Sequence, residues 1–155
     1  MKQDPFTLLN RLVGSWVTEA THPAMPGVVV HGSVDIEWLE GKRFLMHRAR
    51  TDHPDFPDSV SIVGNMQHDI GDDAQHAQAE PKLSMHYFDS RGVFRAYDTS
   101  IDDTTWRFHR EDTTFPQRFT CTFSADGNTL TGTSQVRENN APWRDDLAIT
   151  YRRRT

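Results

Sequence analysis

The two ends of this chain place the strongest constraint on its fold. Residues 12–17, Leu-Val-Gly-Ser-Trp-Val, end a short helical segment and begin a strand with glycine, serine and tryptophan. Residues 147–154, Leu-Ala-Ile-Thr-Tyr-Arg-Arg-Arg, form a last strand that ends in three arginines. Between them, segments of alternating apolar and polar residues are separated by turns. We therefore expect an all-β fold, a closed antiparallel up-and-down barrel of about ten strands in which the first and last strands pair.

A short helix is predicted directly before the first strand. Asp4 offers a side-chain oxygen as a cap, and Pro5 suits the first helical position. The apolar stripe that follows covers barely two turns, and so short a helix is stable only when it is docked. We expect it to cap one end of the barrel. A chain of 155 residues is expected to form a single domain over residues 1–155.

Composition limits the partners and the compartment. The chain has 17 Lys and Arg against 22 Asp and Glu and no basic stripe, which argues against a nucleic-acid partner. Cys121 is the single cysteine, so we expect no intrachain disulfide and a buried thiol in a reducing compartment. No apolar run approaches the ~20 residues of a membrane span, and no signal-peptide core follows Met1. These features predict a cytoplasmic protein with no membrane partner.

A polar tract over residues 67–81 resembles a metal-binding segment at first sight. Its acidic and histidine residues are His68, Asp69, Asp72, Asp73, His76 and Glu80. Their spacing matches neither an EF-hand nor a zinc pattern. We interpret the tract as a solvated loop and predict no metal site.

The register of the early hairpin decides where His47 points. A turn at residues 40–41 pairs Trp38 with Arg43 and Val34 with His47. This pairing puts Trp38 and His47 on the apolar face, which we take as the interior. A core histidine bonded to a neighbour and a histidine that contacts a ligand or shuttles protons both fit this position.

The hairpin of residues 83–100 carries most of the polar aromatic chemistry. A four-residue turn at 89–92 pairs His86 with Arg95, and a turn at 102–103 pairs Asp98 with Arg107 on the outside. The resulting inner face contains His86, Arg95, Tyr97, Trp106, Phe108 and Arg110. The outer face contains Met85, Tyr87 and Phe94, which indicates either a partner surface or a register that is wrong by one residue.

The predicted inner face holds two like charges. The turn at 102–103 sets Arg95 opposite Arg110, and two cations so close destabilise a buried face unless an anion lies between them or that end of the barrel is open to water. We therefore predict that a carboxylate, phosphate or sulfate binds near His86, Arg95 and Arg110, with Tyr97 as a donor. Trp106 and Phe108 would form the apolar wall, to which we add Trp38 and His47.

The ends of the barrel resemble the calycin superfamily, which contains lipocalins and fatty-acid-binding proteins. In those folds the tryptophan of a Gly-x-Trp segment packs at the closed end and a terminal arginine lies across it. The resemblance implies this structural role for Trp16, with Arg152 or Arg153 supplying the guanidinium. Residues 36–45, 87–93 and 123–127 are more closely similar to DUF1579, an uncharacterised bacterial family of lipocalin-like proteins. That family implies a fold and brings no settled activity.

A related ten-stranded family, the nitrobindins, binds haem through a histidine near its C-terminus. No histidine follows His109 in this chain, so haem would need another ligand and we predict no cofactor. Three hypotheses remain. The first is a binding barrel for a small amphipathic or anionic molecule. The second is an enzyme that uses His47 or His86 as acid or base with Tyr97 as a donor. The third is a non-catalytic module that forms a homodimer through its outer patch.

Overall fold

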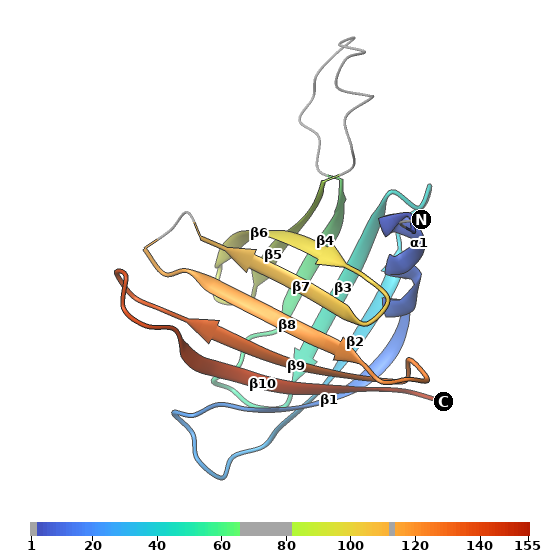
Figure 1. Ribbon diagram of the computed structural model, residues 1–155. Coiled ribbons are helices and arrows are strands. Elements are labelled where there is room, and N and C mark those ends of the chain that lie inside the picture. The colour runs from blue at the N-terminus through green and yellow to red at the C-terminus, as the bar shows by residue number, and fades with distance from the viewer. Residues whose placement is uncertain (1–2, 66–81, 112–113) are drawn as a thin grey trace.

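The computed structural model describes residues 3–65, 82–111 and 114–155, and within them ten antiparallel strands close into a barrel (Figure 1). The strands are β1 (Gly14–Thr21), β2 (Val30–Trp38), β3 (Phe44–Thr51), β4 (Ser59–Asn65), β5 (Leu83–Asp89), β6 (Phe94–Ile101), β7 (Thr105–Arg110), β8 (Gln117–Phe123), β9 (Thr129–Val136) and β10 (Arg144–Arg153). Each strand pairs with its neighbours in the chain, and β1 pairs with β10. The predicted closed up-and-down barrel is confirmed.

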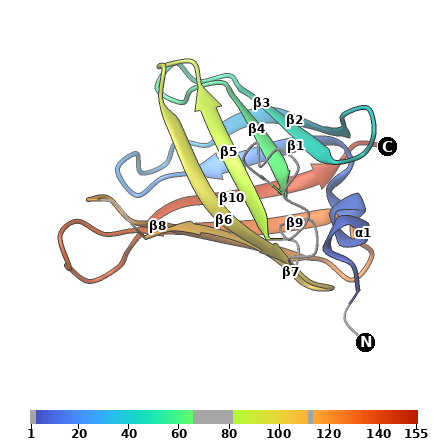
Figure 2. The same cartoon turned by 90° about the horizontal axis from the view of Figure 1, so that it is seen from above.

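A short helical segment covers one end of the barrel. Helix α1 (Pro5–Leu9) continues into a 3-10 turn, η1 (Asn10–Leu12), and the Asp4 carboxylate accepts a hydrogen bond from the Phe6 amide at 3.3 Å. Leu9 and Leu12 are fully buried, so this segment is held by docking, as its length requires. Figure 2 shows α1 at one end of the barrel, with the β1–β2 and β9–β10 loops at the other end. We call these the closed end and the loop end.

Trp16 and Arg153 form the seal of the closed end. Trp16 is completely buried, and its indole N–H donates to the Leu12 carbonyl at 2.9 Å. The Arg153 guanidinium lies 4.1 Å from the centre of the indole ring and donates to the carbonyl of Val13. Gly14 makes room for this contact, because a Cβ there would lie 2.6 Å from an Arg153 nitrogen. The stacked pair is the geometry that the calycin resemblance implied.

Two hairpins have registers that differ from the predicted ones by two residues. In β2–β3, Ile36 pairs with His47, and in β6–β7, Ile101 pairs with Trp106. Because side chains alternate with a period of two, a shift of two residues keeps every side chain on its predicted face. His47 and Trp106 therefore point into the barrel as expected.

The register predicted for β5–β6 is wrong by one residue. Tyr87, not His86, pairs with Arg95. The cause is the turn, which has three residues and not four, since the Asp89 amide donates to the Val93 carbonyl and extends the ladder. His86 consequently faces outward, while Met85 and Tyr87 face inward, opposite to the prediction.

Two further expectations concern loops and helices. The polar tract of residues 67–81 lies outside the described residues. Among the residues that are described, no group of three or more His, Cys, Asp or Glu side chains could hold a metal ion. Neither α1 nor η1 is long and apolar enough to cross a membrane. Cys121 is fully buried, and burial raises the pKa of its thiol, as expected for a small core side chain.

Candidate ligand-binding cavity

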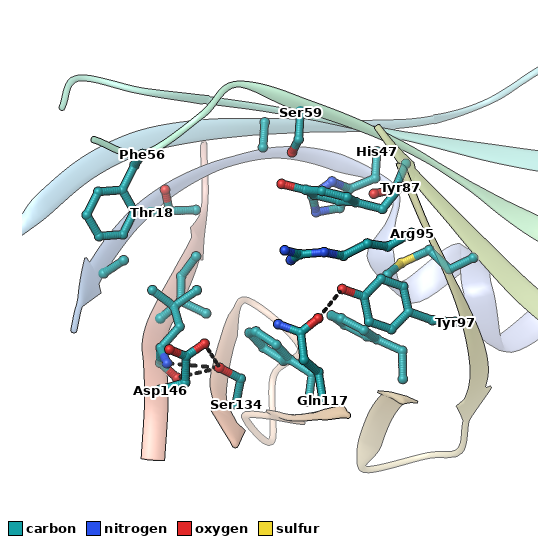
Figure 3. Close-up of a pocket in the computed structure, with 18 of the residues that line it drawn as sticks. Thr18, His47, Phe56, Ser59, Tyr87, Arg95, Tyr97, Gln117, Ser134 and Asp146 are labelled. Carbon is teal, nitrogen blue, oxygen red and sulfur yellow. Dashed lines mark hydrogen bonds between the residues drawn. The ribbon is translucent and has the colours of Figure 1, made fainter. Parts of the chain in front are cut away.

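A cavity of about 250 Å³ lies inside the barrel (Figure 3). Its aromatic lining consists of Phe56, Tyr87, Tyr97, Trp106, Phe108, Phe119 and Tyr151. The rings of Phe108 and Phe119 stack at 4.7 Å between centroids, and Trp106 packs 5.0 Å from Phe108. Strands β6, β7 and β8 thus supply a continuous aromatic wall. Such a wall with few polar groups is typical of small-molecule pockets.

Arg95 carries a positive charge into this cavity. It lies two residues before the buried Tyr97 on β6, so both side chains point inward (Figure 3). Its guanidinium lies 5.9 Å from the ring centre of Tyr87. Over residues 3–65, 82–111 and 114–155, no carboxylate forms an ion pair with Arg95. A charge that is partly buried without a partner is unusual, because removal from water costs free energy.

Gln117 joins Tyr97 and Arg110 beside Arg95. The Tyr97 hydroxyl donates to the Gln117 side-chain oxygen at 3.0 Å, and Nε of Arg110 donates to the same oxygen at 3.1 Å. Burial raises the pKa of Tyr97, while the Arg95 and Arg110 cations oppose that rise. Arg110 does not itself line the cavity but lies behind Gln117.

His47 lies in the cavity lining toward the closed end. It is 9% exposed, and its ring packs 6.2 Å from Trp106 and 6.3 Å from Tyr151, which in turn packs on Trp16. The Tyr151 hydroxyl lies 3.5 Å from Nε2, and Nδ1 is buried without a hydrogen-bond partner. Burial lowers the pKa of His47 from 6.5 to about 4, so its ring is neutral at pH 7.

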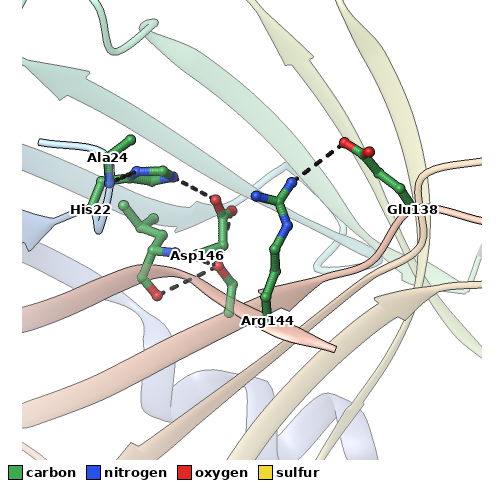
Figure 4. Close-up of polar contacts among 7 residues, drawn as sticks. His22, Ala24, Glu138, Arg144 and Asp146 are labelled. Atoms are coloured by element: carbon green, nitrogen blue, oxygen red, sulfur yellow. Dashed lines mark hydrogen bonds and ion pairs between the residues drawn. The ribbon is translucent and has the colours of Figure 1, made fainter. Parts of the chain in front are cut away.

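The opposite wall carries an acidic group that the sequence did not indicate. A register shift between Asp145 and Ala148 in β10 marks a bulge, and Asp146 within it reaches the cavity. Its carboxylate contacts Nε2 of His22 at 2.6 Å and accepts from the Ser134 hydroxyl at 3.3 Å (Figure 4). Since the Ala24 amide donates to Nδ1 of His22, Nε2 carries the proton and donates to Asp146.

The predicted site residues fall into three places. His47, Arg95, Tyr97, Trp106 and Phe108 line the cavity. Trp38 lies at the closed end, where its indole N–H donates to the Asn10 side chain at 2.7 Å. Arg152 points outward and contacts Glu19 at 3.5 Å, while Arg153 seals the barrel.

His86 lies on the outside of the barrel wall. It lines a second, outer pocket together with Arg95, Tyr97 and Arg110, beside the point where the β6–β7 ladder stops at Asp98 and His109. These four predicted residues are therefore close to one another, but the barrel wall separates His86 from the cavity.

The cavity lining also contains five residues that the sequence did not predict as site residues, namely Tyr87, Gln117, Phe119, Asp146 and Tyr151.

The protein has a calycin-like fold, a barrel of the lipocalin type with an internal cavity. No family model and no curated protein matches the sequence. Among solved structures, Rv2717c from M. tuberculosis aligns with a TM-score of 0.64 and 15% identity over 100% of both chains. S-type phycobiliprotein lyase CPES from Guillardia theta aligns with a TM-score of 0.57 and 12% identity over 96% of this chain and 92% of that one. At such identities these likenesses define the fold alone. The similarity to DUF1579 stays a prediction.

Proposed function

We propose that the barrel binds a compact organic anion, an aromatic or amphipathic carboxylate, in its internal cavity. The observation that carries this proposal is the Arg95 guanidinium, which points into an aromatic cavity and has no carboxylate partner among the described residues. Asp146 on the opposite wall already accepts from His22 and Ser134. Among the described residues, the charged group that lacks a partner in the cavity is therefore a cation, Arg95, and it can bind an anionic ligand. A fold shared with a phycobiliprotein lyase supports a role in handling a small molecule.

The volume of the cavity favours a ligand with one or two rings. An engineered cavity of about 150 Å³ in another protein holds benzene, and the cavity here has about 250 Å³. A four-pyrrole macrocycle such as haem needs more room than this. His47 is the one histidine that lines the described cavity, and it packs between Trp106 and Tyr151 near the closed end. Cavity size and the position of His47 thus both disfavour haem.

The two histidines that the enzyme hypothesis considered, His47 and His86, lie on opposite sides of the barrel wall. His47 faces the interior and His86 faces outward, so the two rings cannot exchange a proton directly. The hydroxyl of Tyr97 already donates to Gln117. Binding without chemistry is the simpler use of this geometry.

The proposal is tested by thermal unfolding with matched ligands. Benzoate, phenylacetate and 2-naphthoate should raise the unfolding temperature, whereas benzylamine should not, because Arg95 offers only donors. At 100 times Kd the stabilisation is about 2.7 kcal/mol, which is a rise of roughly 5–10 °C for a domain of this size. Arg95→Met should remain folded and lose the response. Equal responses to the acids and the amine, or an unchanged response in Arg95→Met, would contradict the proposal.

A second proposal concerns contact between two copies of the chain. Phe88 and Phe94 are 47% and 55% exposed on the outer face of β5 and β6, and their ring centres lie 5.1 Å apart. An exposed aromatic pair on neighbouring strands can pack against the same pair of a second copy about a two-fold axis. Sedimentation should detect dimers that Phe94→Ser abolishes without loss of ligand response. A monomer at all concentrations up to millimolar overturns this proposal.

A further inference from the structure

We infer that Arg110 and Tyr97 lock the side-chain amide of Gln117 with its N–H₂ group toward the cavity, so that the barrel selects a carboxylate over the matching carboxamide. This inference rests on the proposed function and adds a specificity-determining role for Arg110. Arg110 acts through Gln117 and is a positioning residue. The ligand class is then carboxylates, and neutral amides of the same shape should bind more weakly.

The lock consists of two donors on one oxygen. The Tyr97 hydroxyl and Nε of Arg110 lie 3.0 and 3.1 Å from the Gln117 side-chain oxygen. An amide oxygen has two lone pairs, and both are therefore used. Rotating the amide by half a turn would bring its N–H₂ group against the guanidinium, which is always protonated and can only donate. The network thus permits one orientation of Gln117.

The backbone holds Arg110 in place for this role. Arg110 and Gln117 are direct cross-strand partners in the β7–β8 ladder. Nη2 of Arg110 also donates to the Phe115 carbonyl at 3.3 Å, which anchors the far side of the guanidinium. Burial lowers the pKa of Arg110, and a guanidinium nevertheless keeps its proton in proteins, so the group is a cation that only donates.

The consequence for the cavity is a surface of donors only beside Arg95. Figure 3 shows the Gln117 oxygen turned to Tyr97 and the amide nitrogen on the opposite side, facing the cavity that Arg95 also lines. A carboxylate can accept from both groups through its two oxygens, and such charge-assisted bonds are strong. A carboxamide carries no charge and has one acceptor oxygen where the carboxylate has two, and its N–H₂ group would face these donors, so its bonds to Arg95 and Gln117 are fewer or weaker. We expect the carboxylate to bind at least tenfold more tightly than the amide.

The test measures Kd by titration calorimetry for two matched pairs, benzoate with benzamide and 2-naphthoate with 2-naphthamide. Wild-type protein should bind the acids at least tenfold more tightly. In Arg110→Met the amide of Gln117 is free to turn, so its oxygen can accept from the ligand N–H₂ group. Affinity for the amides should therefore rise by fivefold or more, while affinity for the acids falls. If Arg110 acted only through its positive charge, Arg110→Met would lower the affinity for the acids and leave the affinity for the amides unchanged.

Two further variants separate the lock from its alternatives. Arg107→Met removes a cation from the exposed face of the same strand, where Arg107 contacts Asp102 at 3.6 Å, and should leave the ratio of affinities unchanged. The double variant Arg110→Met/Gln117→Met should lose the gain in amide affinity, because the gain passes through Gln117. If Arg110→Met does not fold, Arg110→Gln replaces the donor-only guanidinium with an amide that can also accept from the Gln117 N–H₂ group, and it should likewise narrow the ratio of acid affinity to amide affinity.

The outcomes distinguish the inference from the function on which it rests. Tight binding of the acids by wild-type protein, with no rise in amide affinity in Arg110→Met or Arg110→Gln, overturns the lock and leaves the proposed function intact. A rise that persists in the double variant also overturns it. If wild-type protein binds none of the acids, the proposed function and this inference both fail.

Discussion

Single residues at the two ends of the barrel have separate tasks. At the closed end Trp16 is buried under the Arg153 guanidinium, and no atom of this pair reaches the cavity. Toward the loop end, Arg95 points into the cavity without an ion-pair partner in the described part of the chain. The contact between Trp16 and Arg153 stabilises the fold, and its buried polar groups are hydrogen-bonded. Arg95, in contrast, has no counter-ion among the residues that the structure describes, which is typical of a residue that binds a ligand.

Trp16 gives the sharpest stability prediction at this scale. Trp16→Ala should lower the free energy of unfolding by about 3–5 kcal/mol, because it removes a fully buried indole and leaves a cavity. Chemical denaturation measures this change. Trp143→Ala is the matched control, since Trp143 is only partly buried between Arg118 and Arg137, with the guanidinium carbons 4.2 and 4.7 Å from its ring centre. Equal losses for the two variants would contradict the role of Trp16 as the seal.

At the scale of elements, strands were predictable and one turn was not. Alternation identifies the strands and their inward faces, and an error of two residues in β2–β3 or β6–β7 changes no face. An error of one residue in β5–β6 reversed a whole strand and exchanged His86 for Tyr87. Both turn lengths suit a sequence that contains Gly92, and what decides between them is the added pair between Asp89 and Val93.

The remaining site residues were missed for reasons that also belong to the elements. Asp146 reaches the cavity through a bulge in β10, and a bulge shifts the alternation without a distinctive residue to announce it. Gln117 lies at the first position of β8, where a sequence pattern leaves the boundary between loop and strand open. The aromatic wall, in contrast, was predicted through Trp106 and Phe108, since β7 alternates clearly. The part of the site that follows from periodicity was found, and the part that follows from irregular backbone was not.

For the whole molecule, the barrel is built around a neutral histidine. His47 lies between the sealed end and the cavity, where Tyr151 connects it to Trp16. A protonated ring there would bring a charge into the core beside aromatic rings, with no carboxylate to pair with it among the described residues. The stability of the entire fold is therefore coupled to pH through this one group.

The expected pH dependence follows from the pKa of His47, which is about 4 in the folded protein and 6.5 in the unfolded chain. Above pH 6.5 neither state binds the proton, and the group has no effect. As the pH falls from 6.5 toward 4, the unfolded chain takes up a proton that the folded protein refuses, so stability decreases. The loss is about 2 kcal/mol at pH 5 and levels off on the order of 3 kcal/mol below pH 4. The carboxyl groups of Asp89, Asp102 and Asp126, whose pKa values are lowered from 3.8, affect stability in a lower pH range.

Urea unfolding between pH 7 and 4.5 should therefore give a free energy of unfolding that falls as the pH falls, and His47→Gln should remove this slope. His31→Gln, an exposed position on the outer face of β2, should keep the slope. A slope that persists in His47→Gln would mean that His47 accepts a proton in the folded barrel as readily as in the unfolded chain.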